Sequence, residues 1–269
     1  MGEAFEALEG DEAIILAGGQ SLLAMLNFRL SSPALLVDIN GLGELKGISV
    51  ADGRLRIGAL TRHSAIERSP EVAEHAPLIA EAMPHVAHPA IRNRGTIGGS
   101  IALADPAAEL PACVLALDGR IEIASAKGKR TVAAADFFRG IYETDLAPGE
   151  LVTAVEVPVI APPYRSAFAE LARRPGDYAM VGLAIHGRVD GGVLSDVRLV
   201  FFGIGATPVN AATAASALEG RRLNGAAESD VRDARGEDLE PFDGIDCSGA
   251  TKLHLARELA ARTLKEFAA

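Results

Sequence analysis

The chain has 269 residues, of which 49% are hydrophobic and 23% charged, and this composition is that of a folded globular protein rather than a disordered one. The 36 acidic residues outnumber the 26 basic ones, giving a formal net charge of −10 without any dense cluster of lysine and arginine, which argues against nucleic-acid binding. Cys113 and Cys247 lie far apart without metal-ligand spacing, which argues against a disulfide framework and predicts no metal site, neither zinc nor iron–sulfur.

The N-terminal sequence carries no targeting signal. It reads MGEAFEALEGDEA and is acidic where a signal peptide is basic, and no apolar run approaches the ~20 residues of a membrane span. We therefore expect a cytoplasmic protein with no membrane span.

The N-terminal half alternates short strands, glycine turns and helical pieces. The run Ile14, Ile15, Leu16 predicts a buried strand that ends at the pair Gly18-Gly19, and Ser21 is the expected N-cap of the next helix. The pattern further predicts a strand at 34–41, a hairpin at 48–60 around Asp52-Gly53, and helical pieces over 63–86 broken by prolines.

The rest of the chain continues as a mixed α+β protein. From 95 a second glycine pair, Gly98-Gly99, is expected to form a turn before a helix, followed by a hairpin at 120–138 and a strand at 150–158. The prolines at 162–163 indicate a domain boundary. Beyond it we expect strands at 179–190 and 193–205, a helix at 210–219, an acidic solvated loop at 226–246 and a helix at 248–267.

The two glycine pairs are candidates for an anion site. A strand that feeds a glycine turn and a helix exposes backbone N–H groups, and a serine hydroxyl follows each pair. Two such turns could flank one pyrophosphate, although a glycine pair after a strand is also an ordinary turn. Neither GxGxxG nor GxxxxGK[ST] is present, which argues against a Rossmann dinucleotide site and a P-loop.

Several polar residues near these turns allow two interpretations. Asp105 could accept hydrogen bonds from a ribose or serve as a helix N-cap before Pro106, and Arg92 and Arg94 could neutralise phosphate or anchor a loop. Tyr178, after Asp177, could lie against a flat ring or pack at a domain interface. For His63, His85 and His88 core or surface roles are expected over catalysis, since none has a nucleophile or metal ligand at diagnostic spacing.

Four segments together resemble one known family. They are AGGQSLL at 17–23, IRNRGTIGGSIALADPAAELP at 91–111, ELVTAVEVP at 150–158 and FAELARRPGDYAMVGLA at 168–184. The resemblance is to the FAD-binding medium subunit of molybdenum hydroxylases, the carbon monoxide dehydrogenase and xanthine dehydrogenase group, and it covers nearly the whole chain. It differs from the usual pattern at Ala24, where many relatives have proline, and in having only about a dozen residues before ILAGG, so we expect different packing under the adenine.

The resemblance implies an α+β fold. Residues 1–161 would form an FAD-binding domain of the vanillyl-alcohol oxidase type, with two subdomains that divide near 43–50, and residues 162–269 a C-terminal α+β domain with an antiparallel sheet. Both glycine segments would hold the FAD pyrophosphate, with Asp105 and Glu109 toward the ribose and adenine and Tyr178, with Asp177, at the isoalloxazine. The implied FAD-binding residues are Leu16, Ala17, Gly18, Gly19, Gln20, Ser21, Leu22, Thr96, Ile97, Gly98, Gly99, Ser100, Ala102, Asp105, Glu109 and Tyr178.

The resemblance also implies partner subunits. A large subunit with molybdopterin would oxidise the substrate, a small subunit with two [2Fe-2S] clusters would relay electrons, and FAD in this chain would pass them to NAD+, a quinone, another carrier or O2. The expected assembly is a dimer of heterotrimers, in which this oxidoreductase subunit does not act on the organic substrate alone. The alternative is a stand-alone flavin-binding or cofactor-assembly module of the same fold without redox partners.

Overall fold

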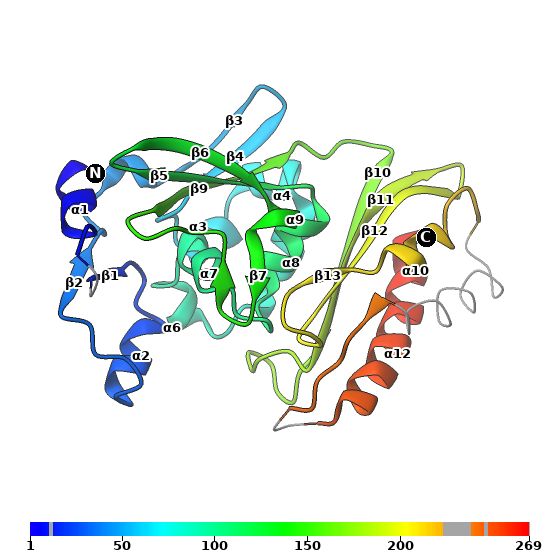
Figure 1. The fold of residues 1–269 in the computed structure, drawn as a ribbon. Coiled ribbons are helices and arrows are strands. Elements are labelled where there is room, and N and C mark those ends of the chain that lie inside the picture. Colours follow the sequence, from blue (N-terminus) through cyan, green and yellow to red (C-terminus); the bar gives the residue numbers. More distant parts are fainter. Residues whose placement is uncertain (11–12, 223–237, 245–246, 269) are drawn as a thin grey trace.

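The computed structural model describes residues 1–10, 13–222, 238–244 and 247–268 (Figure 1). The helices and 3-10 turns of the N-terminal part are α1 (Gly2–Ala7), α2 (Leu22–Asn27), η1 (Gly43–Leu45), α3 (His63–Glu67), α4 (Pro70–His75), α5 (Pro77–Ala82), η2 (Met83–His85), α6 (Pro89–Arg92), α7 (Ile97–Leu103), α8 (Glu109–Ala116) and α9 (Ala134–Phe137). Its strands are β1 (Ala13–Leu16), β2 (Leu35–Asp38), β3 (Ile48–Ala51), β4 (Arg54–Gly58), β5 (Arg120–Ser125), β6 (Gly128–Ala133), β7 (Phe138–Gly140), β8 (Glu143–Thr144) and β9 (Leu151–Pro158).

The N-terminal part contains a small parallel sheet and a larger antiparallel one. Strands β1 and β2 pair in parallel, whereas the five-stranded sheet has the order β3-β4-β9-β5-β6. The hairpin β3–β4 forms as predicted because Asp52 and Gly53 both adopt positive φ, which a tight hairpin turn requires. The helical pieces over 63–86 also follow the prediction, since α4 and α5 each begin at a proline.

The C-terminal part is a four-stranded antiparallel sheet covered on both faces. Its elements are β10 (Tyr164–Leu171), β11 (Val181–Asp190), β12 (Val193–Phe202), β13 (Val209–Asn210), α10 (Ala212–Ser216) and α12 (Gly249–Ala268). Helix α12 packs on β10 and β11, and α5 and α8 of the N-terminal part contact the same sheet (Figure 1). Strand β11 is therefore buried almost continuously, and one hydrophobic core joins both parts.

Two predictions about local structure need correction, and a third, the N-cap position of Ser21, is confirmed. Strand β10 was not expected, because its sequence YRSAFAEL is poor in β-branched residues and pairing with β11 decides its conformation. Gly98 and Gly99 form no turn before a helix, because they lie in the first turn of α7 itself. Ser21 stands at the N-cap of α2 but its side chain makes no capping hydrogen bond.

The predicted domain boundary and acidic loop map onto connections. The boundary after residue 161 falls between β9 and β10, and the split near 43–50 falls on η1 and β3; both divisions stay predictions. The predicted loop at 226–246 lies mostly outside the described residues. In its described part Asp238 accepts hydrogen bonds from the backbone N–H groups of Thr213 and Ala214, so it caps α10.

Candidate flavin site

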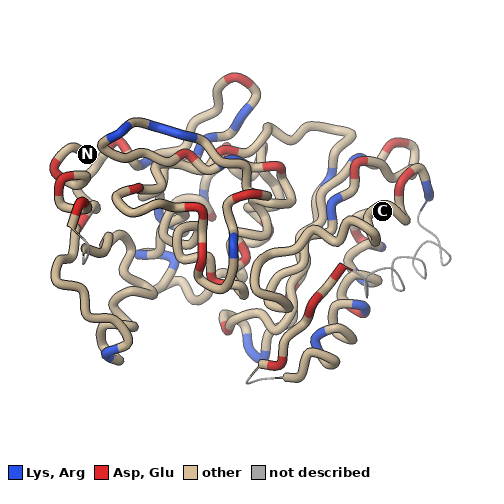
Figure 2. Tube along the Cα trace, in the orientation of Figure 1, with Lys and Arg blue, Asp and Glu red and all other residues tan. Residues whose placement is uncertain are grey.

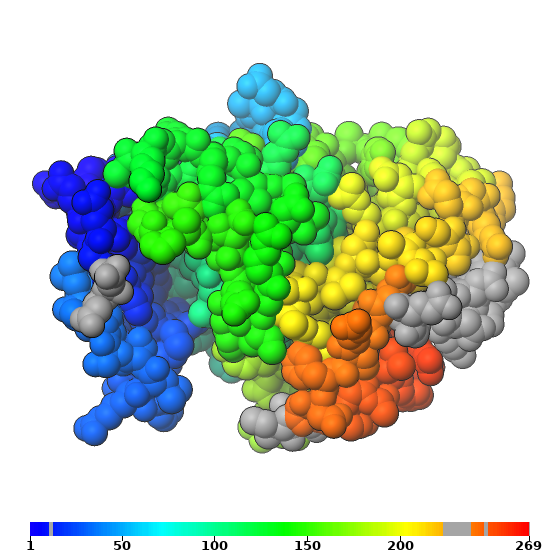
Figure 3. All heavy atoms as spheres, in the orientation of Figure 1, coloured from blue at the N-terminus to red at the C-terminus, as the bar shows by residue number. Residues whose placement is uncertain are grey.

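A deep cavity of about 830 Å³ opens in the N-terminal part, large enough for a cofactor. Its walls come from residues within 8–10, 13–25, 39, 59–63, 86–109, 146–152 and 176–178, segments that are far apart in sequence. Figure 3 shows the surface hollowed between the N-terminal segment, in blue, and the central green part of the chain. Both glycine segments line this cavity, so the structure brings them together.

The first glycine segment presents unpaired backbone donors. Within the part of the chain that the structure describes, no acceptor is found for the backbone N–H groups of residues 18–21. Gly19 adopts φ +73°, the left-handed conformation that an anion-binding nest of successive N–H groups requires at one of its residues. Asn40 holds the segment by donating from Nδ2 to the Ala17 carbonyl at 2.8 Å. Gly18 is buried and the other three residues are half-buried, so N–H groups without partners on this cavity wall are suited to an anionic ligand.

Close backbone contact fixes one glycine segment against the other. A Cβ on Gly18 would lie 2.5 Å from the Arg94 carbonyl oxygen, and a Cβ on Gly98 would lie 2.5 Å from the Cβ of Ala59. Only glycine permits approach this close. Thr96 caps α7 by accepting from the Gly99 N–H at 3.2 Å, and the Gly98 N–H donates to the Ala59 carbonyl. Gly18 and Gly98 thus allow their backbone segments to pack closely against Arg94 and Ala59, and they are not simply turn residues.

Most of the predicted site residues line the cavity. These are Ala17, Gly18, Gly19, Gln20, Ser21, Leu22, Thr96, Gly98, Gly99, Ser100, Ala102, Asp105, Glu109, Asp177 and Tyr178. The structure does not bring Leu16 and Ile97 to the wall: Leu16 ends β1 and Ile97 is fully buried in the core. Their inclusion followed from their neighbours in the motif; side chains alternate along β1 at Leu16, and Ile97 lies on the face of α7 that packs into the core.

Acidic residues and Tyr178 gather at one end of the cavity. Burial raises the pKa of Glu109 to about 7, and nearby acidic charge adds to this effect. Burial, with the charges of Asp105 and Glu109, also raises the pKa of Tyr178, although the residue is 72% exposed overall. Asp105 accepts from the Ala107 N–H at 2.9 Å and is not the N-cap of α8, which is Ala108. Asp105, Glu109 and Tyr178 therefore share one end of the site.

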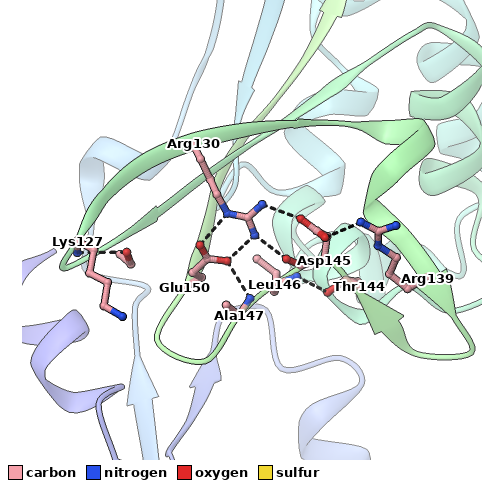
Figure 4. Close-up of polar contacts among 9 residues, drawn as sticks. Lys127, Arg130, Arg139, Thr144, Asp145, Leu146, Ala147 and Glu150 are labelled. Atoms are coloured by element: carbon pink, nitrogen blue, oxygen red, sulfur yellow. Dashed lines mark hydrogen bonds and ion pairs between the residues drawn. The ribbon is translucent and has the colours of Figure 1, made fainter.

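A loop that the sequence motifs did not indicate closes another wall. Residues 146–152 line the cavity, and Arg130 on β6 holds them by donating to Glu150 at 2.6–2.7 Å and to Asp145 at 2.6 Å (Figure 4). These bonds raise the pKa of Arg130 and lower the pKa of Glu150. Arg139 donates to the other oxygen of Asp145 at 2.7 Å. Arg130 lies 15 and 20 residues before its partners Asp145 and Glu150, so no local sequence pattern predicts these pairs.

The structure decides between the alternatives for Arg92. Its guanidinium donates to both oxygens of Glu67 and to the carbonyls of Val86 and Ala87, so Arg92 anchors a loop. Arg62, which the sequence did not indicate, donates to Asn40 and to the Arg94 carbonyl. Both arginines organise the segments that carry the cavity.

The three histidines occupy different environments. His63 lines the cavity but is buried, and burial lowers its pKa to about 4; its ring nitrogens have no hydrogen-bond partner among the described residues. His88 is exposed and lies beside Gly176. His85 pairs with Glu170. The two residues are 85 positions apart in the sequence, so no local pattern predicts this contact.

Other kinds of site find little support in the described residues. Over the described ranges, no group of three or more His, Cys, Asp or Glu side chains is arranged to hold a metal ion. Basic and acidic residues are interspersed along the trace in Figure 2. A search of the helices among these residues finds none with the length and apolarity needed to cross a bilayer.

Comparison with known proteins defines the class. Residues 1–160 match the family described as FAD binding domain in molybdopterin dehydrogenase, and residues 166–267 match the CO dehydrogenase flavoprotein C-terminal domain. The chain belongs to this family of FAD-binding medium subunits of molybdenum hydroxylases, and it is an oxidoreductase subunit. The resemblance found in its motifs is thereby confirmed, as is the fold that it implied.

The similar proteins are named as dehydrogenases or oxidoreductases, one of them as a subunit of a complex. The 6-hydroxypseudooxynicotine dehydrogenase complex subunit alpha of Paenarthrobacter nicotinovorans is 39% identical over 95% of this chain and 86% of its own length. A carbon monoxide dehydrogenase structure from Hydrogenophaga pseudoflava matches with a TM-score of 0.96 and 36% identity, over 99% of this chain and 93% of the other. The quinoline 2-oxidoreductase of Pseudomonas putida 86 matches with a TM-score of 0.94 and 38% identity, over 99% and 93%.

Proposed function

We propose that this chain is the FAD-bearing electron-transfer subunit of a heterotrimeric molybdenum hydroxylase, accepting electrons from [2Fe-2S] clusters of a small subunit. A large molybdopterin subunit would oxidise the substrate, and the complex would be a dimer of heterotrimers. When bound, FAD exchanges electron pairs with an external acceptor and single electrons with the clusters. The observation that carries the proposal is the run of unpaired N–H groups at 18–21, held against the second glycine segment.

The donor set of the cavity fits the FAD pyrophosphate. In our proposal the N–H groups of Gly18 to Ser21 and the hydroxyl of Ser100 donate to phosphate oxygens, since such donors favour anions. Gln20 Nε2 donates to the Gly18 carbonyl at 3.1 Å and so stiffens the segment before a ligand arrives. This preorganisation lowers the entropic cost of binding.

We assign the flavin ring to the part of the cavity lined by Glu109 and Tyr178. The Tyr178 side chain is exposed there, and the charge of Glu109 is near enough to contribute to the raised pKa of Tyr178. We therefore assign Glu109 to the ring end, which revises the expectation from the resemblance that it lies toward the ribose and adenine. Asp177 flanks Tyr178 in the same connection between β10 and β11.

An exposed apolar surface supports the presence of a partner subunit. Large apolar side chains stand exposed along β1, α2 and β2, with Phe28 and Leu30 each 77% exposed. Exposed large apolar side chains concentrated in one region of the chain are typical of interaction surfaces when they form a patch. The relatives named above take their names from different substrates, so we place the choice of substrate in the large subunit and not in this chain.

Purification tests the two halves of the proposal separately. We expect the isolated chain to bind one FAD per polypeptide and to co-purify from its native cells with molybdopterin and iron–sulfur subunits. A chain that takes up no FAD would contradict the flavin assignment. A chain that holds FAD but never co-purifies with such subunits would favour the stand-alone module.

A further inference from the structure

Two tyrosines border the mouth of the cavity, where its ring end meets solvent. Tyr178 lines the cavity and is 72% exposed in the connection between β10 and β11. Tyr142 is 58% exposed at the tip of the hairpin β7–β8, and its hydroxyl donates to Asp105 Oδ2 at 3.4 Å. Asp105 is itself part of the cavity wall, so this hydrogen bond holds the hairpin tip at the mouth. Each part of the molecule thus contributes one exposed aromatic ring to the same opening.

The hairpin tip holds its tyrosine in an unusual backbone conformation. Tyr142 adopts φ +56°, in the left-handed region that a bulky side chain rarely occupies, and Ile141 beside it is 53% exposed. Strand β8 packs against α7, the helix that begins in the second glycine segment. Strained backbone of this kind persists where the surrounding structure fixes it, and it is concentrated at ligand sites. Two exposed apolar side chains in such a turn, beside a cavity, support a binding surface.

The charges that act on the two tyrosines are acidic. Burial raises the pKa of each phenol, and the carboxylate of Asp105 adds to both shifts. Glu109 adds to the shift of Tyr178, and no basic side chain of the described ranges offsets these effects. Phosphate groups of a dinucleotide would be repelled here, whereas an uncharged ring would not. Aromatic side chains also stack favourably on flat rings. The mouth therefore fits a planar ligand without charge.

We propose that this mouth is the docking site of the external electron acceptor and that the acceptor is an uncharged quinone, which Tyr142 and Tyr178 hold by stacking. The inference rests on the proposed function, because the quinone must meet a flavin ring in the cavity. The reduced flavin gives up two electrons and two protons, and the quinone takes up both pairs to become the hydroquinone, so the reaction needs no further co-reactant. Asp105 keeps the Tyr142 ring in place through its hydroxyl.

The tyrosines themselves can report binding, since the chain has only three of them. With 3-fluorotyrosine incorporated, the ¹⁹F NMR spectrum of the chain with oxidised FAD should show one resonance for each, assigned by Tyr→Phe variants. Duroquinone is fully substituted and already oxidised, so it can bind without transferring electrons. It should shift Tyr142 and Tyr178 saturably, and NAD+ should shift neither. Tyr164 is the internal control, because it also donates to an aspartate, Asp196, at 3.1 Å, but lies on the C-terminal sheet.

Reoxidation of the flavin gives a second measurement. The FAD-loaded chain is reduced with dithionite, freed of excess reductant and mixed with duroquinone in anaerobic stopped flow. Tyr142→Ala should raise the quinone concentration for half-maximal rate about tenfold and leave the limiting rate within about twofold, because it removes a stacking partner but not the flavin. Tyr142→Phe keeps the ring and should behave as the wild type within about twofold. Tyr164→Ala, the matched control, should change neither quantity.

The outcomes separate this proposal from the one on which it rests. Shifts of Tyr142 or Tyr178 caused by NAD+ would overturn the choice of an uncharged acceptor. Absence of any shift with duroquinone, or an unchanged half-saturating concentration in Tyr142→Ala, would overturn the docking site itself. Failure of the wild-type chain to bind FAD would instead refute the proposed function.

Discussion

Adding one methyl group at Gly18 probes the contact between the glycine segments. The Cβ of alanine would lie 2.5 Å from the Arg94 carbonyl oxygen, whereas an ordinary contact needs at least 3.4 Å, so the segments must separate by about 0.9 Å. The atom it meets belongs to backbone that Arg62 and His63 also hold, and a flexible side chain cannot absorb the shift. Overpacking of this kind costs about 1–3 kcal/mol of stability.

The same shift should weaken cofactor binding. Displacing the donors of residues 18–21 removes at least one hydrogen bond to phosphate, which is worth about 1.5–3 kcal/mol. We therefore expect the Kd for FAD to rise about 10- to 100-fold in Gly18→Ala. Fluorescence titration of the flavin-free protein measures this change, and thermal unfolding without FAD measures the stability cost.

Gly41→Ala is the matched control for this substitution. A Cβ at Gly41 meets nothing within 4 Å, so the variant should bind FAD as the wild type does. If Gly18→Ala bound FAD with the wild-type Kd, the packed glycine segments would not be what holds the pyrophosphate, and the reasoning would be wrong.

Three further predictions concern other parts of the molecule. Burial of His186 lowers its pKa from 6.5 to about 4, so its titration leaves stability unchanged above pH 6.5 and lowers stability by about 3 kcal/mol as pH falls from 6.5 toward 4, where the unfolded chain takes up the proton first; His186→Gln should flatten this part of the pH dependence of unfolding, and an unchanged curve would contradict it. Arg130→Gln should lower the free energy of unfolding by about 1–2 kcal/mol because two carboxylates lose their partner, and more than Arg139→Gln does, as denaturant titration can check. Tyr178→Ala should keep stability within about 0.5 kcal/mol because the side chain is 72% exposed, yet make bound flavin more accessible to iodide quenching; equal quenching in both proteins would remove Tyr178 from the ring.

Local chemistry explains which elements the sequence could predict. The hairpin β3–β4 was predictable because Asp52-Gly53 specifies a tight turn, and α4 and α5 because each begins at a proline. Strand β10 could not be predicted, since pairing with β11 outweighs the weak β propensity of its residues. For Gly98-Gly99 the capping hydroxyl of Thr96 decides in favour of helix.

Only part of the candidate site could likewise be predicted from the sequence. The prediction of site residues was reliable where it rested on glycine backbone geometry, as at Gly18-Gly19, which line the cavity. Membership in a motif alone did not distinguish Gly98, which lines the wall, from Ile97, which is buried in the core. The contribution of Arg130 and the pair of His85 with Glu170 depend on segments that meet only in the folded protein. Single-sequence patterns contain no information about such contacts.

Titration of the flavin-free chain with FAD and riboflavin tests the central claim most directly. Riboflavin has the ring but lacks the pyrophosphate, ribose and adenine of FAD, so comparing the two measures what the rest of the cavity, the glycine segments included, adds to binding of the ring. We predict one FAD per chain and a Kd at least 100-fold lower than that for riboflavin, because two or more hydrogen bonds to charged phosphate are made. Equal affinity for the two ligands, or no binding of FAD, would contradict the account.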